Sequence, residues 1–209
     1  MDFSIASILM LDGFTNGAVY ALLGLATVLV FTVTRVIFIP QGEFVAYGAL
    51  TLAMLQAGKV PGTVWLLMIL AGVASLMECW SRWHHERNLA HGIKAGVRIL
   101  ILPTLIALLT WWSATQNFSM WIQALLSVAV VATFGPLVYR IAYQSLESAS
   151  PLVLLIVSVG VHFAMTGLGL LFFGAEGFRN PSFLNESWQM GPLNITGQVV
   201  IIFLIALIM

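Results

Sequence analysis

The sequence PLVLLIVSVGVHFAMTGLGLLFF, residues Pro151–Phe173, is apolar along almost its whole length. A helix needs about 20 apolar residues to cross the roughly 30 Å hydrocarbon core of a bilayer, so this stretch predicts a transmembrane helix. Ser150 places a capping hydroxyl ahead of a proline at the first helical position, which predicts where the helix begins. His162 lies inside the stretch. Because an ionisable group in a span is costly, His162 is a candidate for a role in transport; packing against a neighbouring helix is the alternative.

The composition of the whole chain indicates the same environment. The 209 residues are 60% hydrophobic and 8% charged, with a mean hydropathy of +1.01. A soluble domain usually carries about a quarter charged residues, so lipid must be the solvent for much of this surface. The net charge of zero gives no basic field for nucleic acid. Cys79 is the single cysteine, which excludes an intrachain disulfide or a cysteine-based zinc site.

Further apolar stretches precede and follow this one. They predict an all-α fold, a polytopic transmembrane helical bundle of about six complete spans plus a partial seventh, in a single domain over residues 1–209. A charged stretch over residues 78–98 and a Gly-, Pro- and Asn-rich loop over residues 174–194 separate predicted spans. The predicted spans are Gly13–Thr34, Phe44–Gly58, Val60–Met77, Ile99–Trp112, Met120–Tyr139, Pro151–Phe173 and the unfinished Ile195–Met209.

The basic residues predict the orientation of these spans. Cytoplasmic segments carry an excess of Lys and Arg, so we expect the N-terminus outside, with only Lys59 and Arg179 among the basic residues on its side. The residues that this orientation places in the cytoplasm are Arg35, Arg82, Arg87, Lys94, Arg98 and Arg140. No Lys or Arg precedes the first apolar stretch, so it is predicted to be a retained span and not a secretory signal.

The sequence PQGE, residues 40–43, interrupts the helical pattern between two apolar segments. We expect this break, with Gln41 and Gly42 at its centre, near the cytoplasmic boundary. Glu43 opens the next helix, where a carboxylate meets the positive end of the helix dipole, and Arg35 on the same side could pair with it. A capped turn with an ion pair is one interpretation. The other is a transport pathway, because broken backbone at membrane depth often lines one.

No motif in the chain predicts catalysis, so we expect no enzyme activity, catalytic residue or cofactor. The phosphate-binding sequence GxxxxGK[ST] is absent, which excludes ATP binding by that route. The tract HHERNLAH, residues 84–91, lacks the spacing of the zinc motif HExxH. It is interpreted as a solvated cytoplasmic loop, and no metal site is expected.

Two segments resemble the permease subunits of branched-chain amino-acid ABC importers of the LivH type. The first is NGAVYALLGLATVLVFTVTRVIFIPQGEFVAYGAL, Asn16–Leu50, with a span that ends near Arg35, a break that contains Gly42 and Glu43, and a helix rich in small residues. The second is YRIAYQSLESASPLVLLIVSVGVHFAMTGLGLLFFG, Tyr139–Gly174, which is similar to the cytoplasmic AYRPLR loop of that family and the span after it.

The resemblance implies a permease domain that forms a translocation pathway in the bacterial inner membrane, with a periplasmic N-terminus. It also implies several partners: a second permease subunit, two cytoplasmic ATP-binding subunits and a periplasmic substrate-binding protein. The implied substrates are branched-chain amino acids or related small amides. Two other functions remain open from the residues: an ATP-independent transporter or channel, and a membrane scaffold without transport activity.

The chain departs from the family pattern in three places. Gln41 stands where family members often have His, and the AYRPLR-like loop has Gln144, Ser145 and Glu147 in place of its usual basic residue. Residues 78–119 look like an insertion relative to the family. Family permeases also continue past the point where this chain ends at Met209, so a C-terminally truncated permease is expected.

Overall fold

The structure, a computed structural model, describes residues 3–86, 89–116, 118–184, 186–190 and 193–209. It consists of two compact units. The central unit covers Ile39–Asn180, and the terminal unit combines Met1–Phe38 with Pro181–Met209. The expectation of a single domain stays a prediction.

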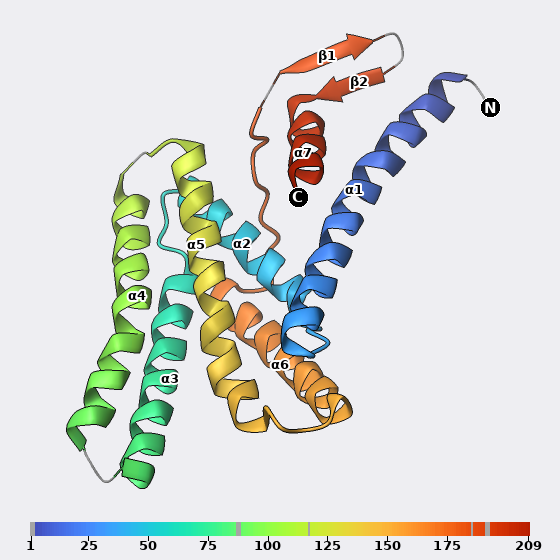
Figure 1. Ribbon diagram of the computed structural model, residues 1–209. Coiled ribbons are helices and arrows are strands. Elements are labelled where there is room, and N and C mark those ends of the chain that lie inside the picture. Colours follow the sequence, from blue (N-terminus) through green and yellow to red (C-terminus); the bar gives the residue numbers. More distant parts are fainter. Residues whose placement is uncertain (1–2, 87–88, 117, 185, 191–192) are drawn as a thin grey trace. The chain divides into compact units, whose positions relative to one another are not determined.

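The central unit contains five α-helices (Figure 1). Helix α5 is followed by a π-helical turn over Tyr139–Tyr143, which is wider than an α-helix, and by a tighter 3₁₀ turn over Gln144–Leu146. The AYQSL segment, expected as a loop, is therefore a helical continuation of α5. The α-helices are α2 (Gln41–Gln56), α3 (Gly62–Glu86), α4 (Leu89–Thr115), α5 (Met120–Val138) and α6 (Pro151–Phe173).

The terminal unit contains α1 (Phe3–Thr34), a β-hairpin and α7 (Gly197–Ile208). Strands β1 (Ser187–Met190) and β2 (Leu193–Thr196) pair antiparallel, with Ser187 opposite Thr196. The hairpin corrects the expectation that residues 174–194 form only a loop. Alternation of side chains along SWQM and LNIT suits a short two-stranded ribbon, but the turn-forming residues around it obscured that pattern.

Five helical segments in the described part of the chain are long and apolar enough to cross a membrane. The chain is therefore a multi-pass membrane protein with an all-α membrane region. Helices α2 and α7 have 16 and 12 residues, which is short for a span. The count of six complete spans and a partial seventh stays a prediction. The five segments are Ile5–Thr34, Gly62–Arg82, Gly92–Thr115, Met120–Leu146 and Pro151–Phe173.

Large apolar side chains cover the outward faces of these helices. Val33 on α1 is 83% exposed and Leu125 on α5 is 72% exposed. Soluble proteins rarely expose contiguous apolar surface of this extent. Hydrocarbon is the solvent that makes such surface favourable, in agreement with the low charge of the sequence.

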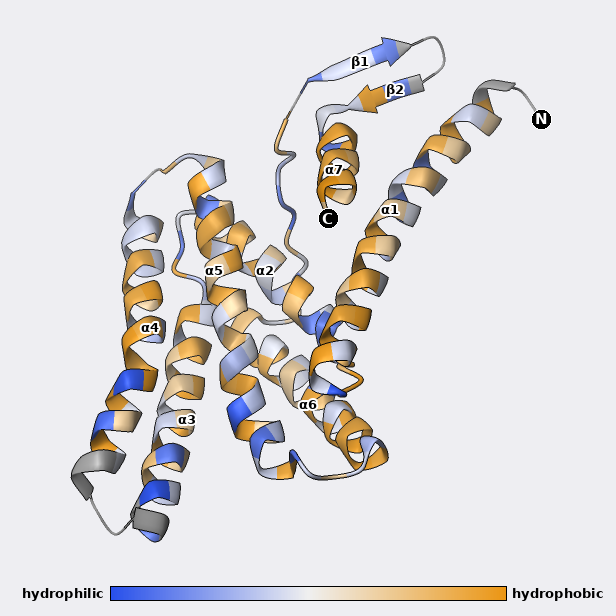
Figure 2. Cartoon of the chain, viewed as in Figure 1, coloured by the Kyte–Doolittle hydropathy of each residue, from blue (hydrophilic) through white to orange (hydrophobic). Residues whose placement is uncertain are grey.

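The central unit has one aromatic end and one basic end. Trp65 on α3 stacks edge-on against Trp111 on α4, with ring centroids 5.6 Å apart. At the other end Arg82 and Arg98 line a common cavity, and Figure 2 shows hydrophilic residues gathered on α3, α4 and α5 there. From Trp65 to Arg82 the helix rises about 26 Å, close to the thickness of a hydrocarbon core. This separation is large enough for the two ends to lie at opposite interfaces of a membrane.

The charged stretch over residues 78–98 is helical on both sides and not a loop. Helix α3 continues to Glu86 and α4 begins at Leu89. Glycines allow the two helices to approach closely, because a Cβ added at Gly96 would lie 2.7 Å from Ser75 Oγ and one at Gly92 would lie 3.3 Å from the Cys79 carbonyl. Small residues four positions apart are a common packing surface between membrane helices. Part of the expected insertion, residues 78–119, thus belongs to a tight α3–α4 hairpin and includes its basic end.

Buried polar side chains join the other helices of the central unit. Thr51 on α2 shares a hydrogen bond with Thr63 on α3, with their oxygens 2.8 Å apart, and both residues are fully buried. Tyr143 and Ser158 share another at 2.9 Å, which fixes the π-helical turn to α6. Helix α6 begins at Pro151 and ends at Phe173, as predicted, although the Ser150 hydroxyl makes no capping hydrogen bond.

A substitution at Gly62 tests the contact between α3 and α6. A Cβ at Gly62 would lie 2.8 Å from the Phe172 carbonyl oxygen, so Gly62→Ala is expected to lower the free energy of unfolding by about 1–3 kcal/mol. At Gly72, on the same helix, a Cβ would meet nothing within 4 Å. Gly72→Ala should leave stability unchanged or raise it by up to about 1 kcal/mol. Reversible unfolding in detergent micelles measures both, and equal effects would contradict the packing described.

Candidate functional site

The site is centred on a carboxylate and an imidazole from two helices of the central unit. Glu43 lies in the first turn of α2, and His162 is the middle residue of α6. His162 Nδ1 lies 2.8 Å from Glu43 Oε1. The ring nitrogen makes no aligned hydrogen bond, so the two groups are in close contact without one. The sequence singled out both residues separately, and the fold brings them together.

The carboxylate of Glu43 is partly satisfied. Its side chain is 16% exposed and that of His162 is 35% exposed. Thr166 donates a hydrogen bond from Oγ1 to Glu43 Oε1 at 3.3 Å, and its hydroxyl also lies 3.0 Å from the His162 carbonyl. Glu43 Oε2 is buried and has no hydrogen-bond partner among the described residues. One carboxylate oxygen is therefore buried without a hydrogen bond, while the Glu43 side chain as a whole lines the cavity described below.

Tyr47 fixes the register of α2 against α6. Its hydroxyl donates a 2.6 Å hydrogen bond to the Met165 carbonyl, and the side chain is 2% exposed. Its ring packs edge-on against Phe134 of α5, with centroids 5.8 Å apart. Gly169 leaves room for this ring, since a Cβ there would lie 3.5 Å from the Tyr47 oxygen. Because Tyr47 follows Glu43 by one helical turn, this anchor also holds the carboxylate beside His162.

A cavity of about 310 Å³ opens beside Glu43. Glu43 and Thr166 supply its polar groups at one end. Leu50, Met165 and Leu170 are among its apolar walls. A pocket of this composition can hold a small molecule with a cationic or hydrogen-bonding end and an apolar side chain.

The PQGE segment contacts α6 at mid-length. Gln41 and Gly42 form the first turn of α2 with Glu43, and Glu43 contacts the middle residue of α6. With 23 residues, α6 is about 34 Å long, which is enough to cross a hydrocarbon core. The expected position of PQGE near the cytoplasmic boundary stays a prediction, because a contact between two helices does not give their depth in a bilayer.

Arg35 ends α1 in a left-handed backbone conformation, with φ 57°. Its N–H donates to the Phe31 carbonyl at 2.8 Å, which closes the last turn. A non-glycine residue in this conformation costs about 1 kcal/mol, so the end of α1 is a strained position. Arg35 belongs to the terminal unit and Glu43 to the central unit. Their pairing stays a prediction.

Sequence reasoning missed Tyr47 and Thr166. Each lies four residues after a residue that was singled out, on the same helical face, since Tyr47 follows Glu43 and Thr166 follows His162. A search for hydroxyl groups at that spacing would have found both. The contact between the two helices joins residues more than a hundred positions apart, which no local pattern indicates.

A metal centre is not formed by the described side chains. Among them, no group of three His, Cys, Asp or Glu residues lies close enough to hold an ion. The side chains of His85, Glu86 and His91, in the HHERNLAH tract, lie outside the part of the chain that the structure describes. His84 stacks on Trp80 at the end of α3, with ring centroids 6.2 Å apart.

Comparisons with protein-family models, curated proteins and solved structures found no match for this chain. The similarity to importer permeases therefore rests on the two quoted segments of sequence. The geometry of the Glu43–His162 site rests on the structure alone.

A double-mutant cycle tests the coupling of Glu43 and His162. His162→Ala leaves the carboxylate with less compensation in a mostly buried site, and is expected to lower the free energy of unfolding by about 2 kcal/mol. In a Glu43→Gln background the same change should cost less than about 1 kcal/mol, because the buried carboxylate that faces the imidazole has been removed. As a control, His162→Ala combined with Glu147→Gln at the basic end should be additive. Additivity in both pairs would show that the contact contributes nothing.

Proposed function

We propose that this protein is the membrane-spanning permease subunit of an ABC importer for branched-chain amino acids or related small amides. The observation that carries the proposal is the Glu43–His162 pair, which lies at the midpoint of a span beside the start of a short helix. Ionisable residues at this depth are costly and mark substrate or ion pathways in transport proteins. Interrupted helices at membrane depth form the binding sites of many transporters.

The chemistry of the cavity fits the proposed substrates. An amino acid carries an ammonium group, which the buried Glu43 carboxylate can accept through its unpartnered Oε2. The apolar walls formed by Leu50, Met165 and Leu170 fit a branched aliphatic side chain. Glu43 lies in the first turn of α2, where the positive end of the helix dipole adjoins the cavity.

The resemblance to importer permeases supplies the energetic part of the proposal. A permease without a phosphate-binding loop takes its energy from other chains: two cytoplasmic ATP-binding subunits, with a second permease subunit and a periplasmic substrate-binding protein. The proposed location is the bacterial inner membrane with the N-terminus in the periplasm. The gathering of basic residues at one end of the central unit supports that orientation.

One observation favours a second candidate, an ATP-independent transporter. A carboxylate–imidazole pair can exchange a proton, and such pairs form proton relays in pumps and transporters. The two candidates share the pathway and differ in the source of energy. Uptake that survives ATP depletion and requires a proton gradient would select this candidate over an ABC permease.

Uptake measurements test the pathway. Glu43→Gln is expected to lower the uptake of radiolabelled leucine on the order of tenfold or more at unchanged expression, because a charge-assisted contact to the substrate is lost. Glu147→Gln, which neutralises a carboxylate at the basic end, is the matched control and should leave uptake unchanged. If Glu43→Gln transports as well as the native protein, the pair has a packing role only.

Affinity purification of the tagged product of the full gene tests the energy source. The proposal predicts that two ATP-binding subunits and a second permease subunit co-purify from the native membrane. If no ATP-binding subunit co-purifies and uptake is insensitive to ATP depletion, the protein is not an ABC permease. The proposed pathway at Glu43 and His162 would not be affected by that result.

A further inference from the structure

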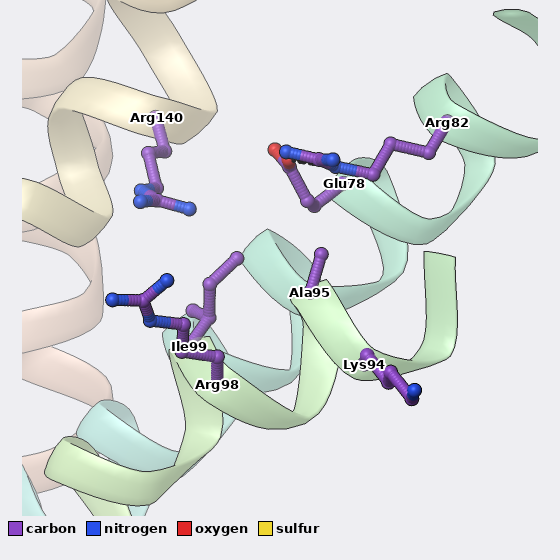
Figure 3. A pocket seen from close by; sticks show the side chains of 7 residues that line it. All are labelled: Glu78, Arg82, Lys94, Ala95, Arg98, Ile99 and Arg140. Atoms are coloured by element: carbon purple, nitrogen blue, oxygen red, sulfur yellow. Dashed lines mark hydrogen bonds and ion pairs between the residues drawn. The ribbon is translucent and has the colours of Figure 1, made fainter. Parts of the chain in front are cut away.

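A second polar site lies at the basic end of the central unit, away from the Glu43–His162 pair. A cavity of about 560 Å³ opens between α3, α4 and the π-helical turn after α5 (Figure 3). Four cationic side chains and one carboxylate line it. The ionisable lining residues are Glu78, Arg82, Lys94, Arg98 and Arg140.

The arginines differ in how they are compensated. Arg82 donates from Nε to Glu78 Oε1 at 2.7 Å, so the single carboxylate is already engaged. Arg98 and Arg140 make no ion pair with a carboxylate in the described part of the chain. Figure 3 shows their guanidinium groups directed toward the same space from two elements, with Lys94 pointing away. The cavity thus presents two uncompensated guanidinium groups to one point.

The fold holds Arg140 in this position by a specific local structure. Arg140 lies in the π-helical turn Tyr139–Tyr143, and the wider turn changes the direction of its side chain relative to α5. Tyr143 anchors the turn through the buried hydrogen bond to Ser158 on α6. Arg98 lies on α4, which the close glycine contacts hold against α3. Both arginines therefore project from rigid elements, so little ordering is required when an anion binds.

The ligand chemistry follows from these groups. Guanidinium groups form paired hydrogen bonds with phosphate oxygens, and they are preferred where planar bidentate recognition is needed. The lipid-facing side of α4 continues from Arg98 with Ile101, Leu102 and Leu105, each more than half exposed. A molecule with a phosphate at the interface and acyl chains below it matches this order of charged and apolar surface.

We propose that this cavity binds a phosphate group through Arg98 and Arg140, and that an anionic phospholipid supplies it. The headgroup occupies the cavity and the acyl chains lie along α4. The proposal does not depend on the transported substrate, since the two sites share no residue.

Native mass spectrometry of the full-length protein tests the proposal, with phosphatidylglycerol or phosphatidylcholine added to the micelles. The native protein is expected to bind phosphatidylglycerol on the order of tenfold more tightly than phosphatidylcholine. The double variant Arg98→Gln/Arg140→Gln should lose this preference. The control Lys59→Gln/Arg179→Gln removes the same charge from residues outside the cavity and should keep it.

Two further measurements make the outcome decisive. The single variants Arg98→Gln and Arg140→Gln should each lose part of the preference, which protects the test against a double variant that fails to fold. Excess inorganic phosphate then separates the sources of the ligand. If phosphate stabilises the native protein but not the double variant, and the native protein shows no preference between the two lipids, the site binds soluble phosphate. Equal binding of both lipids by all variants, with no effect of phosphate, would overturn the proposal.

Discussion

The contact between the first turn of α2 and the middle of α6 determines most of what the central unit can do. Tyr47 donates a hydrogen bond to the Met165 carbonyl, and this buried bond sets the level along α6 at which α2 begins. Glu43, one turn earlier, is consequently held beside His162. In hydrocarbon an unpartnered polar group is costly, so the hydroxyl and the carboxylate act together to fix the packing of the two helices. The interrupted backbone and the pair of ionisable groups lie at the same level because of this one constraint.

The charged groups of the central unit fall into two sets with different physical roles. The Glu43–His162 pair contacts at the middle of α6 and is mostly buried, where each unsatisfied atom carries a large cost. Arg98 and Arg140 lie at the basic end, exposed to the interface, where charge is inexpensive and anionic headgroups are near. In the tight α3–α4 hairpin, the Trp65–Trp111 contact lies at one end and the basic residues at the other. The distance between these ends is about one hydrocarbon thickness. The same architecture thus supports a polar site within the membrane and another at its surface.

Local chemistry in the sequence predicted where helices begin and end. It did not predict which residues of two distant helices lie at the same level. The bounds of α6 were predicted from a proline at its start, and Gly174 ends the helix with φ 79°. The Gly92–Gly96 spacing, which forms the α3–α4 contact, was hidden inside a stretch interpreted as a charged loop. Glu43 and His162 were each found as ionisable residues near apolar segments, but their contact was not. Apolar length reports how far a helix extends and gives no information on which residues of two distant helices share a level.

The most direct test of the central claim is the depth of the second turn of α2 in the bilayer. Val45 is exposed in the central unit. A fluorophore attached through Val45→Cys in a Cys79→Ser background can be quenched by lipids brominated at different acyl-chain positions. Deep bromines are expected to quench this label most strongly, as for a label at Phe163 beside His162, and unlike a label at Val97, which is exposed and adjoins Arg98 at the basic end. A quenching profile for Val45 that matches the one for Val97 would place PQGE at the interface and contradict the proposed pathway.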